Sequence, residues 1–167
     1  MHSIFRISLS CVVLSSSLSA VAEEPPVTLP IQRLSMDMAL KAARMSIEAC
    51  RNKGLNISVT VVDRGGHEQV TLRDTLTVPV TLTVSKQKAY AAMNFNAPTS
   101  DLEDRFSSPF SPGKVEGIVL SAGALPIEAG GTIIGGIGVS GAPSGQTDEE
   151  CAAAGLDAIR TELEMSL

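Results

Sequence analysis

The chain has 167 residues, with 13 Lys and Arg against 18 Asp and Glu, and a formal net charge of −5 at pH 7. That length fits one domain with its own core. An acidic chain with a single Tyr and no Trp has no basic stripe for nucleic acid, and nothing beyond its N-terminal run is apolar enough for a membrane span.

The N-terminus has the pattern of a secretory signal peptide. Arg6 precedes an apolar and small-residue run, which ends in the A-x-A sequence of Ala20 to Ala22. This pattern predicts cleavage after Ala22 and a periplasmic or secreted protein. Residues 1–22 are therefore assigned to the signal, 23–33 to an extended segment, and 34–167 to the folded domain.

Two cysteines, Cys50 and Cys151, remain after that cleavage. In an oxidising compartment an even pair favours a disulfide, but both residues would serve equally well as small buried thiols. Sequence alone leaves the two interpretations open, because it does not give the separation of the two Cα atoms. With one histidine left, a zinc cluster is excluded.

The first half of the domain predicts a helix, a hairpin and a second helix. Ser35 caps a helix that ends before Gly54 and has apolar residues in steps of four and three: Met36, Leu40, Ala43, Ile47 and Cys50. Alternating residues at 57–61 and 67–73 predict two strands joined by the turn at 63–66. After Pro79 a helix is expected, with Val84, Lys88, Ala91 and Phe95 on one face.

The second half predicts a short helix, three strands and a final helix. Ser100 to Glu103 has the pattern of a capping box before a helix that buries Leu102 and Phe106. Strands are expected at 118–120, around 125–127 and at 132–139, and a second capping box at 147–150 opens the last helix. The predicted order is α-β-β-α-α-β-β-β-α, which indicates an α+β domain with helices packed on one antiparallel sheet.

Residues 136–141 spell G-x-G-x-x-G, the fingerprint of dinucleotide-binding folds. Pro143 to Gly145 follow, so no helix opens on the last glycine, and no second strand follows. We therefore expect no nucleotide. Glycines within a strand also permit close approach of a helix, a second subunit or a flat ligand, and helix or subunit packing is the favoured alternative.

Three stretches resemble the GlcG/HbpS family, often described as haem-degrading, which includes the C-terminal domain of the PduO cobalamin adenosyltransferase. They are VTVVDRGGHEQV, the Lys88-Ala89 pair, and GGTIIGGIGVSGAPSGQTDEECAAAGLDAI near the end. The resemblance covers residues 34–159 and implies a profilin-like or PAS-like fold, a homo-oligomer, and haem or a related tetrapyrrole as ligand. The sequence after Arg73 departs from the family pattern.

The resemblance also indicates candidate ligand-binding residues. His67 is the one histidine outside the leader and the strongest candidate for an iron ligand, although a plain solvent-facing position after the turn is a slightly favoured alternative. Tyr90 and Met36 are weaker candidates, for which packing is the favoured alternative. Arg73, Lys86 and Lys88 would pair with haem propionates, although an ordinary solvated surface role is an alternative for each. Gly136 and Gly138 are the candidates for contact with the flat face of a ligand.

The leading hypothesis is an exported haem-binding protein with a role in storage or sensing, or as an accessory protein. One alternative is an enzyme or accessory protein acting on a small hydroxy acid or carbonyl compound, with Arg73 and Lys88 holding its carboxylate. Another is an oligomeric structural subunit without a ligand. No nucleophile–base pair is apparent, since Ser140 lacks the nucleophile-elbow sequence, and a non-enzymatic role is favoured.

Overall fold

The computed structural model describes residues 24–106, 108 and 111–165. Two compact units, residues 1–30 and 31–167, make up the chain. In the first unit, residues 24–30 contain neither helix nor strand. The predicted signal peptide lies outside the described residues. Every element described below belongs to the second unit.

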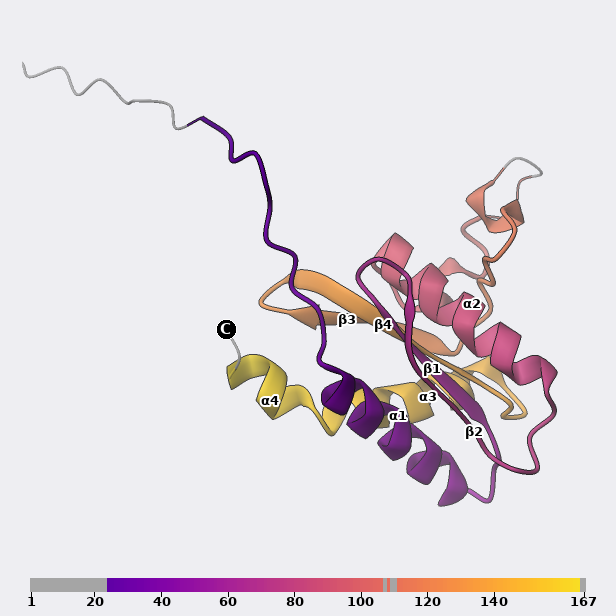
Figure 1. The fold of residues 1–167 in the computed structure, drawn as a ribbon. Helices are drawn as coiled ribbons and strands as arrows, with labels where there is room; N and C mark the ends of the chain where they lie inside the picture. Colours follow the sequence, from indigo (N-terminus) through magenta and orange to yellow (C-terminus); the bar gives the residue numbers. More distant parts are fainter. Residues whose placement is uncertain (1–23, 107, 109–110, 166–167) are drawn as a thin grey trace, which may run out of the picture. The chain divides into compact units, whose positions relative to one another are not determined.

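The second unit is built on a four-stranded sheet (Figure 1). Its strands are β1 (Ser58–Asp63), β2 (Glu68–Arg73), β3 (Ala124–Ala129) and β4 (Thr132–Ser140), in the order β2-β1-β4-β3. Each neighbouring pair is antiparallel, which confirms the predicted α+β class with hairpins. All six residues of β1 are buried, because helices cover both faces of the sheet.

Helices α1 (Met36–Arg51) and α3 (Gly145–Asp157) pack on one face of the sheet, and α2 (Val80–Phe95) packs on the other (Figure 1). A short α4 (Arg160–Met165) follows α3. Two 3₁₀ turns, η1 (Thr99–Leu102) and η2 (Pro112–Lys114), lie in the connection between α2 and β3.

The glycines of β4 let α2 lie directly against the sheet. A Cβ added to Gly138 would overlap the carbonyl oxygen of Ser85 and lie 2.6 Å from the amide nitrogen of Ala89. A Cβ on Gly136 would overlap the carbonyl oxygen of Ala89 and lie 3.0 Å from the Cβ of Met93. Any side chain at either position would therefore push the helix away from the strand.

Buried hydroxyls fix α2 along β1. The Ser58 and Thr81 hydroxyls are 2.7 Å apart, and those of Thr60 and Ser85 are 2.8 Å apart. All four residues are buried. Because each hydroxyl meets another, burial leaves none of the four unsatisfied, and the pairs specify which turn of the helix faces which strand residue.

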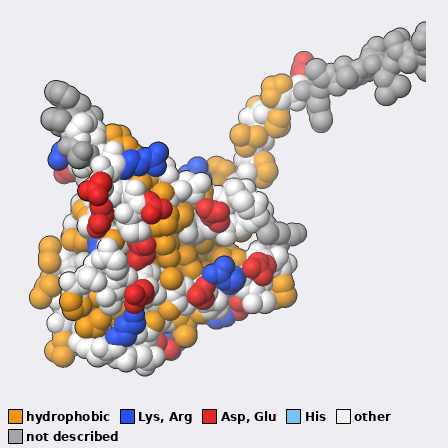
Figure 2. Space-filling model, turned by 180° about the vertical axis from the view of Figure 1, so that it is seen from behind, with side chains coloured by type: hydrophobic (Ala, Val, Ile, Leu, Met, Phe, Trp, Pro, Cys, Tyr) orange, Lys and Arg blue, Asp and Glu red, His pale blue; other side chains and the backbone are white. Residues whose placement is uncertain are grey.

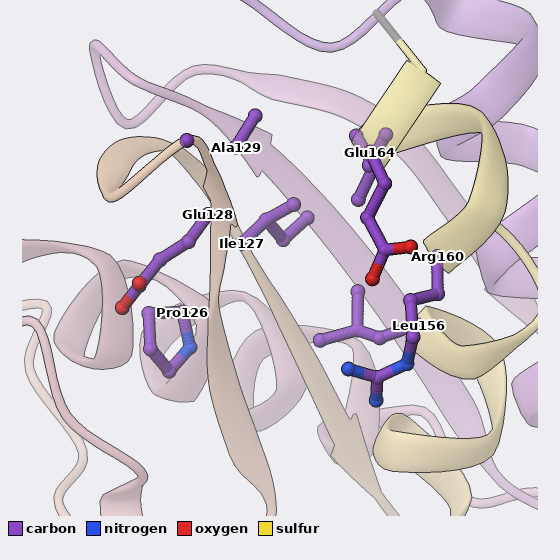
Figure 3. A pocket seen from close by; sticks show the side chains of 9 residues that line it. Pro126, Ile127, Glu128, Ala129, Leu156, Arg160 and Glu164 are labelled. Carbon is purple, nitrogen blue, oxygen red and sulfur yellow. The ribbon is translucent and has the colours of Figure 1, made fainter. Parts of the chain in front are cut away.

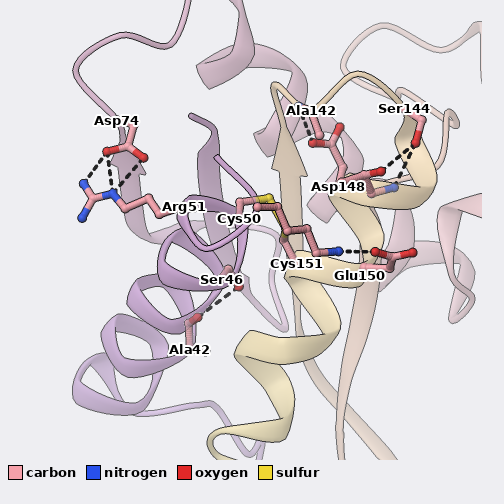
Figure 4. Close-up of a disulfide and its surroundings, with 12 residues drawn as sticks. Ala42, Ser46, Cys50, Arg51, Asp74, Ala142, Ser144, Asp148, Glu150 and Cys151 are labelled. Atoms are coloured by element: carbon pink, nitrogen blue, oxygen red, sulfur yellow. Dashed lines mark hydrogen bonds and ion pairs between the residues drawn. A yellow bond between two sulfur atoms is a disulfide. The ribbon is translucent and has the colours of Figure 1, made fainter. Parts of the chain in front are cut away.

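On the other face a disulfide joins α1 to α3 (Figure 4). Cys50 and Cys151 have Cα atoms 5.6 Å apart, are separated by 101 residues in sequence, and are fully buried. Closing a loop of that length stabilises a fold by about 4.7 kcal/mol in the chain-entropy view. Close packing accompanies the bond, since a Cβ on Gly155 of α3 would lie 2.5 Å from the carbonyl oxygen of Ala42 in α1.

The predicted faces of the two long helices are confirmed in part: Ala43, Ile47 and Cys50 of α1 and Lys88 and Ala91 of α2 are buried, but the other predicted residues are not. The buried stripe of α1 runs through Ala39, Ala42, Ala43, Ser46, Ile47 and Cys50, whereas Met36 is 63% exposed, so the prediction that it faces the core was wrong. The buried face of α2 includes Ser85 and Ala89 rather than Val84 and Phe95. In both helices small side chains face the neighbour because the backbones approach closely.

The predicted element order is wrong in the second half. No strand forms at 118–120. That segment lies between Gly117 and Gly123, both at positive φ, and Leu120 packs against Gly113 of its own loop. The other two strands predicted in this half, around 125–127 and at 132–139, form β3 and β4 and pair with each other.

Two predicted capping boxes also fail. Ser100 lies in a 3₁₀ turn, and its amide and hydroxyl donate to Glu149, so Ser100 caps no helix. The last helix begins after Ser144, whose Oγ accepts from the Thr147 amide at 3.1 Å. A turn at 158–159 divides it into α3 and α4.

We predict that Gly138→Ala lowers the free energy of unfolding by at least about 3 kcal/mol, because the methyl group must displace the α2 backbone. Urea denaturation of the purified domain measures this change. Gly131→Ala is the control. Its added Cβ meets nothing within 4 Å, so only its positive φ of 76° costs stability, about 1 kcal/mol. Equal losses in the two variants would contradict the packing argument.

Candidate functional site

A cleft of about 590 Å³ lies between the start of β2 and the outer side of α2. We call it the β2–α2 cleft. Its volume is within the range of about 300–1,000 Å³ usual for small-molecule and cofactor pockets. The lining residues come from β2, α2 and the loop before β3: Gly66, Glu68, Leu82, Thr83, Lys86, Gln87, Tyr90, Glu116 and Gly117.

One wall of this cleft is polar. Lys86 donates to Glu68 at 2.9 Å, and Glu68 also accepts from the Thr71 hydroxyl at 3.3 Å. Lys86 and Glu68 are each nearly half exposed. Because such a solvated pair is worth little, the ammonium of Lys86 is available to an anionic group that enters the cleft.

The turn between β1 and β2 rests on the aromatic ring of Tyr90. Gly66 has a φ of 80°, and a Cβ there would lie 2.7 Å from Cδ2 of Tyr90. The turn therefore requires glycine for both its backbone angle and its contact. Tyr90 remains 36% exposed, so an apolar ring and a phenol contribute to the cleft wall.

Asp63 holds this turn together and positions His67. One oxygen of the buried Asp63 carboxylate accepts from the amides of Gly65 at 2.8 Å and His67 at 3.0 Å. Arg33 lies 3.3 Å from the other oxygen. Burial acts to raise the pKa of Asp63, but the two amides and Arg33 together keep it below the ordinary value of 3.8.

His67 lies between two lining residues of the cleft, Gly66 and Glu68. Its imidazole is 79% exposed, and Nδ1 lies 3.4 Å from the Asp63 carboxylate. The ring is thus open to solvent at the edge of the cleft. Two other candidates from the sequence, Lys86 and Tyr90, line the same cleft.

Four other predicted residues lie elsewhere. Arg73 lines a different hollow, beside α1, and donates to the Thr77 carbonyl at 2.5 Å. Gly136 and Gly138 are covered by the α2 backbone, so their close approach is to a helix. Lys88, treated in the sequence analysis as a surface or ligand-binding residue, is buried.

Lys88 pairs with Asp148 at the end of β4. Its Nζ lies 3.2 Å from the Asp148 carboxylate and donates to the Val139 carbonyl at 3.3 Å. The other oxygen of Asp148 accepts from the Ala142 amide at 2.9 Å (Figure 4). Burial raises the pKa of Asp148, although Ala142 and Lys88 oppose the shift. The pair ties α2 to the start of α3, and Lys88 is not available to a ligand.

Sequence reasoning named Lys86 and Tyr90 as candidates but missed the other lining residues of the β2–α2 cleft. Leu82, Thr83, Lys86, Gln87 and Tyr90 recur in steps of three and four, which places them on one helical face. That spacing was a usable signal. No signal in the sequence identifies Glu116 and Gly117, because only folding brings their loop next to α2.

A smaller hollow of about 240 Å³ lies between β3 and α4. Figure 3 shows Arg160 and Glu164 on the α4 side of this hollow and Ile127 on the β3 side. Its lining residues include none of the predicted site residues. On the face drawn in Figure 2, basic and acidic side chains are interspersed with apolar ones, so that face has no continuous basic surface.

Within the described residues, no group of three or more His, Cys, Asp or Glu side chains is arranged to hold a metal ion. No helix in that part of the chain has the length and apolar character needed to cross a membrane.

We predict opposite pH responses for the two buried aspartates. Asp63 should titrate below 3.8 and Asp148 above it, as followed by the side-chain carboxyl carbons in NMR. The stability from Asp63 is present above its unfolded-state pKa and is lost as the pH falls through its lower folded-state value. The contribution of Asp148 is present below its unfolded-state pKa and is lost as the pH rises through its higher folded-state value.

The variants Asp63→Asn and Asp148→Asn assign the two resonances and remove the matching slope from a plot of unfolding free energy against pH. Midpoints on the same side of 3.8 would contradict the burial and hydrogen-bonding argument.

Comparison with known proteins identifies the fold and family. Residues 34–157 match the family described as "Haem degrading protein HbpS-like". The crystal structure of a double mutant of HbpS from Streptomyces reticuli has a TM-score of 0.77 and 37% identity, over 86% of this chain and 99% of that one. No curated protein sequence matched.

Two further solved structures share the fold. One, described as a PduOC:heme complex, has a TM-score of 0.69 and 25% identity, over 77% of this chain and 96% of that one. The other, the Klebsiella pneumoniae protein ORFY, has a TM-score of 0.77 at 21% identity, over 83% of this chain and 98% of that one. With its match over most of the folded unit, the chain belongs to the HbpS-like, haem-degrading family.

Proposed function

We propose that this protein is an exported haem-binding protein and that haem lies in the β2–α2 cleft. The observation that carries the proposal is the position of the cleft, about 590 Å³ in volume, beside His67. A family relative was crystallised as a heme complex, which supports haem as the ligand class.

The residues around the cleft fit the chemical parts of haem. The exposed imidazole of His67 is a suitable iron ligand, and the phenol of Tyr90, whose ring packs against Gly66, is an alternative one. Lys86 would pair with a propionate, replacing its solvated contact with Glu68. The ring of Tyr90 and the side chain of Leu82 supply apolar surface for the porphyrin.

Bound haem would supply an iron that accepts a ligand atom from the protein and gives a strong visible absorption band. The chain contributes binding and orientation, since Asp63 fixes the backbone on both sides of Gly66 and thereby the position of His67. We propose storage or sensing, or an accessory role, rather than turnover.

The structure does not support the alternative in which Arg73 and Lys88 together hold a carboxylate. Lys88 is buried against Asp148, whereas Arg73 lies with residues of α1. A ligand-free structural subunit is the remaining alternative, and haem titration separates it from the proposal.

We predict that the domain binds about one haem per chain with a saturable Soret band. His67→Ala should shift the band and weaken binding about tenfold or more, which corresponds to 1.4 kcal/mol or more. Lys86→Gln should weaken binding only a few-fold and leave the band position unchanged, because it removes a charge and not an iron ligand. Hemin titration followed by absorbance measures both effects.

Tyr90→Phe and Lys114→Gln complete this experiment. Lys114 is an exposed lysine outside the cleft, so Lys114→Gln should match the unmodified protein. A band that shifts in Tyr90→Phe but not in His67→Ala would assign the iron to the phenolate and overturn the role of His67. A protein without any saturable band would overturn haem binding and favour the ligand-free subunit.

We propose that the chain is exported and assembles as a homo-oligomer. The signal-like N-terminus and the Cys50–Cys151 disulfide support export, because disulfides persist mainly in oxidising compartments. The exposed apolar side chains of Leu76, Val78 and Val80, which are at least 60% exposed, support assembly, since such groups are usually covered in an oligomer.

We predict that protein recovered from the periplasm or medium begins at Glu23, contains one disulfide and has a native mass that is a multiple of the chain mass. Denaturing and native mass spectrometry of the same sample, with alkylation before and after reduction, test all three points. An uncleaved chain in which Cys50 and Cys151 are both free thiols would contradict export, and a single-chain native mass would contradict assembly.

A further inference from the structure

The two edges of the four-stranded sheet differ in the backbone groups that they leave free. β2 and β3 are the edge strands, and each has one side without a partner strand. Unpaired N–H and C=O groups on such a side are a template for pairing with another chain. The groups that remain free on each edge therefore decide where a further strand can add.

The edge of β3 is closed. The Val139 amide donates to the Gly123 carbonyl at 2.8 Å, so the alternation along the strand turns the backbone of Ala124 and Pro126 away from β4. The Thr99 hydroxyl accepts from the Ala124 amide at 2.9 Å and donates to its carbonyl at 3.4 Å. Pro126 has no N–H to donate. Between Ala124 and Pro126 this edge therefore offers no amide to a further strand.

The edge of β2 is open. The Asp74 amide donates to the Ile57 carbonyl at 3.0 Å, and the pairing with β1 continues without interruption as far as Val70. By the alternation of an antiparallel pair, the N–H and C=O groups of Thr71 and Arg73 point away from β1. No described strand pairs with this side of β2. Both residues can therefore exchange hydrogen bonds with an added strand.

The segment before α1 has the pattern of such a strand. Val27, Leu29 and Ile31 alternate with Thr28 and Pro30, and a period of two places the three apolar side chains on one face of an extended chain. All three are at least 64% exposed, so the described part of the same chain leaves them uncovered. A partner from another chain would cover them.

The position of Pro30 suits a new edge strand. Backbone N–H groups alternate along a strand just as side chains do. When the amides of Val27, Leu29 and Ile31 face β2, the nitrogen of Pro30 faces the outer edge. Proline is tolerated on the outer side of an edge strand and prevents pairing with a further chain there. The addition would therefore stop after one strand.

Charge complementarity sets the direction of the added strand. Glu24 precedes the apolar residues of the segment and Arg33 follows them, whereas β2 begins with Glu68 and ends with Arg73. In the antiparallel direction Glu24 lies toward Arg73 and Arg33 toward Glu68, so opposite charges meet at both ends. The parallel direction would bring like charges together at both ends, which is unfavourable.

The added apolar side chains would lie on the α2 face of the sheet. The Thr71 hydroxyl donates to that of Thr60 at 3.3 Å, and the Thr60 hydroxyl meets Ser85 of α2. A residue directly opposite Thr71 has its side chain on the same face. The connection from β2 to α2 also carries exposed apolar side chains: Leu76, Val78 and Val80.

We infer that residues 27–31 of one chain add to the free edge of β2 in a second copy of the chain, as a fifth, antiparallel strand. Leu29 lies opposite Thr71, and Val27 lies opposite Arg73. Reciprocal exchange of the segment gives a closed two-fold pair. The inference rests on the proposed homo-oligomer, for which it names the surface, and it does not depend on haem binding.

The test compares prolines at two neighbouring positions in the full chain. Leu29→Pro removes an N–H that faces β2, whereas Thr28→Pro removes one that faces away, and both keep the backbone extended. Leu29→Pro should therefore have a lower native mass than the unmodified protein, and Thr28→Pro should not. Leu29→Ala keeps the amide and should weaken assembly less than Leu29→Pro. Native mass spectrometry measures all four proteins.

Hydrogen exchange of the ¹⁵N-labelled protein tests the individual hydrogen bonds. The amides of Thr71 and Arg73 should exchange at least about tenfold more slowly in the unmodified protein than in Leu29→Pro, because the added strand protects them. In the unmodified protein the amide of Leu29 should be protected, while that of Thr28 should exchange rapidly.

Three results would overturn the inference. They are equal native masses of Leu29→Pro and Thr28→Pro, rapid exchange of Thr71 and Arg73 in the unmodified protein, and protection of these amides in a single-chain species, which would mean that the segment folds back on its own chain. An oligomer that Leu29→Pro leaves intact overturns this inference alone. A single-chain mass of the unmodified protein overturns the homo-oligomer as well.

Discussion

The contact between α2 and the glycines of β4 is the constraint on which the rest of the structure depends. Gly136 and Gly138 have no side chains, so the helix backbone lies against the strand. This close approach turns Ser85 and Ala89 toward the sheet. The same rotation leaves the face with Lys86 and Tyr90 outside, where it forms a wall of the β2–α2 cleft. The glycine-rich strand therefore shapes the proposed haem site without touching the ligand.

Acidic residues at the start of α3 connect the layers at one end of the sheet. Asp148 pairs with Lys88 of α2 and accepts from the Ala142 amide. Glu149 accepts from the amides of Ser100 and Gly123. The sequence pattern around Asp148 and Glu149 suggests helix capping. In the structure these two residues instead connect α3 to α2, to η1 and to the start of β3. Because these groups are buried or partly buried, their contacts specify geometry more than they add stability.

The hollows on the two sides of β2 are lined by different kinds of side chain. On the α2 side, an exposed imidazole, a phenol and one available ammonium surround a larger space. On the α1 side, guanidinium groups surround a smaller space with an apolar surface. β2 is an edge strand, so it has a partner strand on one side only. Its residues contact α1 on one face of the sheet and α2 on the other. The β1–β2 hairpin therefore contacts a helix on each face of the sheet.

The sequence by itself determined the α+β class, the β1–β2 and β3–β4 hairpins and the family, since these follow from local periodicity, turn residues and recognisable motifs. It left the Cys50–Cys151 bond open, and only folding showed that α1 and α3 bring the two Cα atoms to 5.6 Å. The tertiary structure also decided the helix faces, the burial of Lys88 and the grouping of His67 with Lys86 and Tyr90. Hydrophobic periodicity in the sequence indicates that a helix forms, but it does not give the distance between that helix and the element packed against it. That distance depends on side chains that are far away in the sequence.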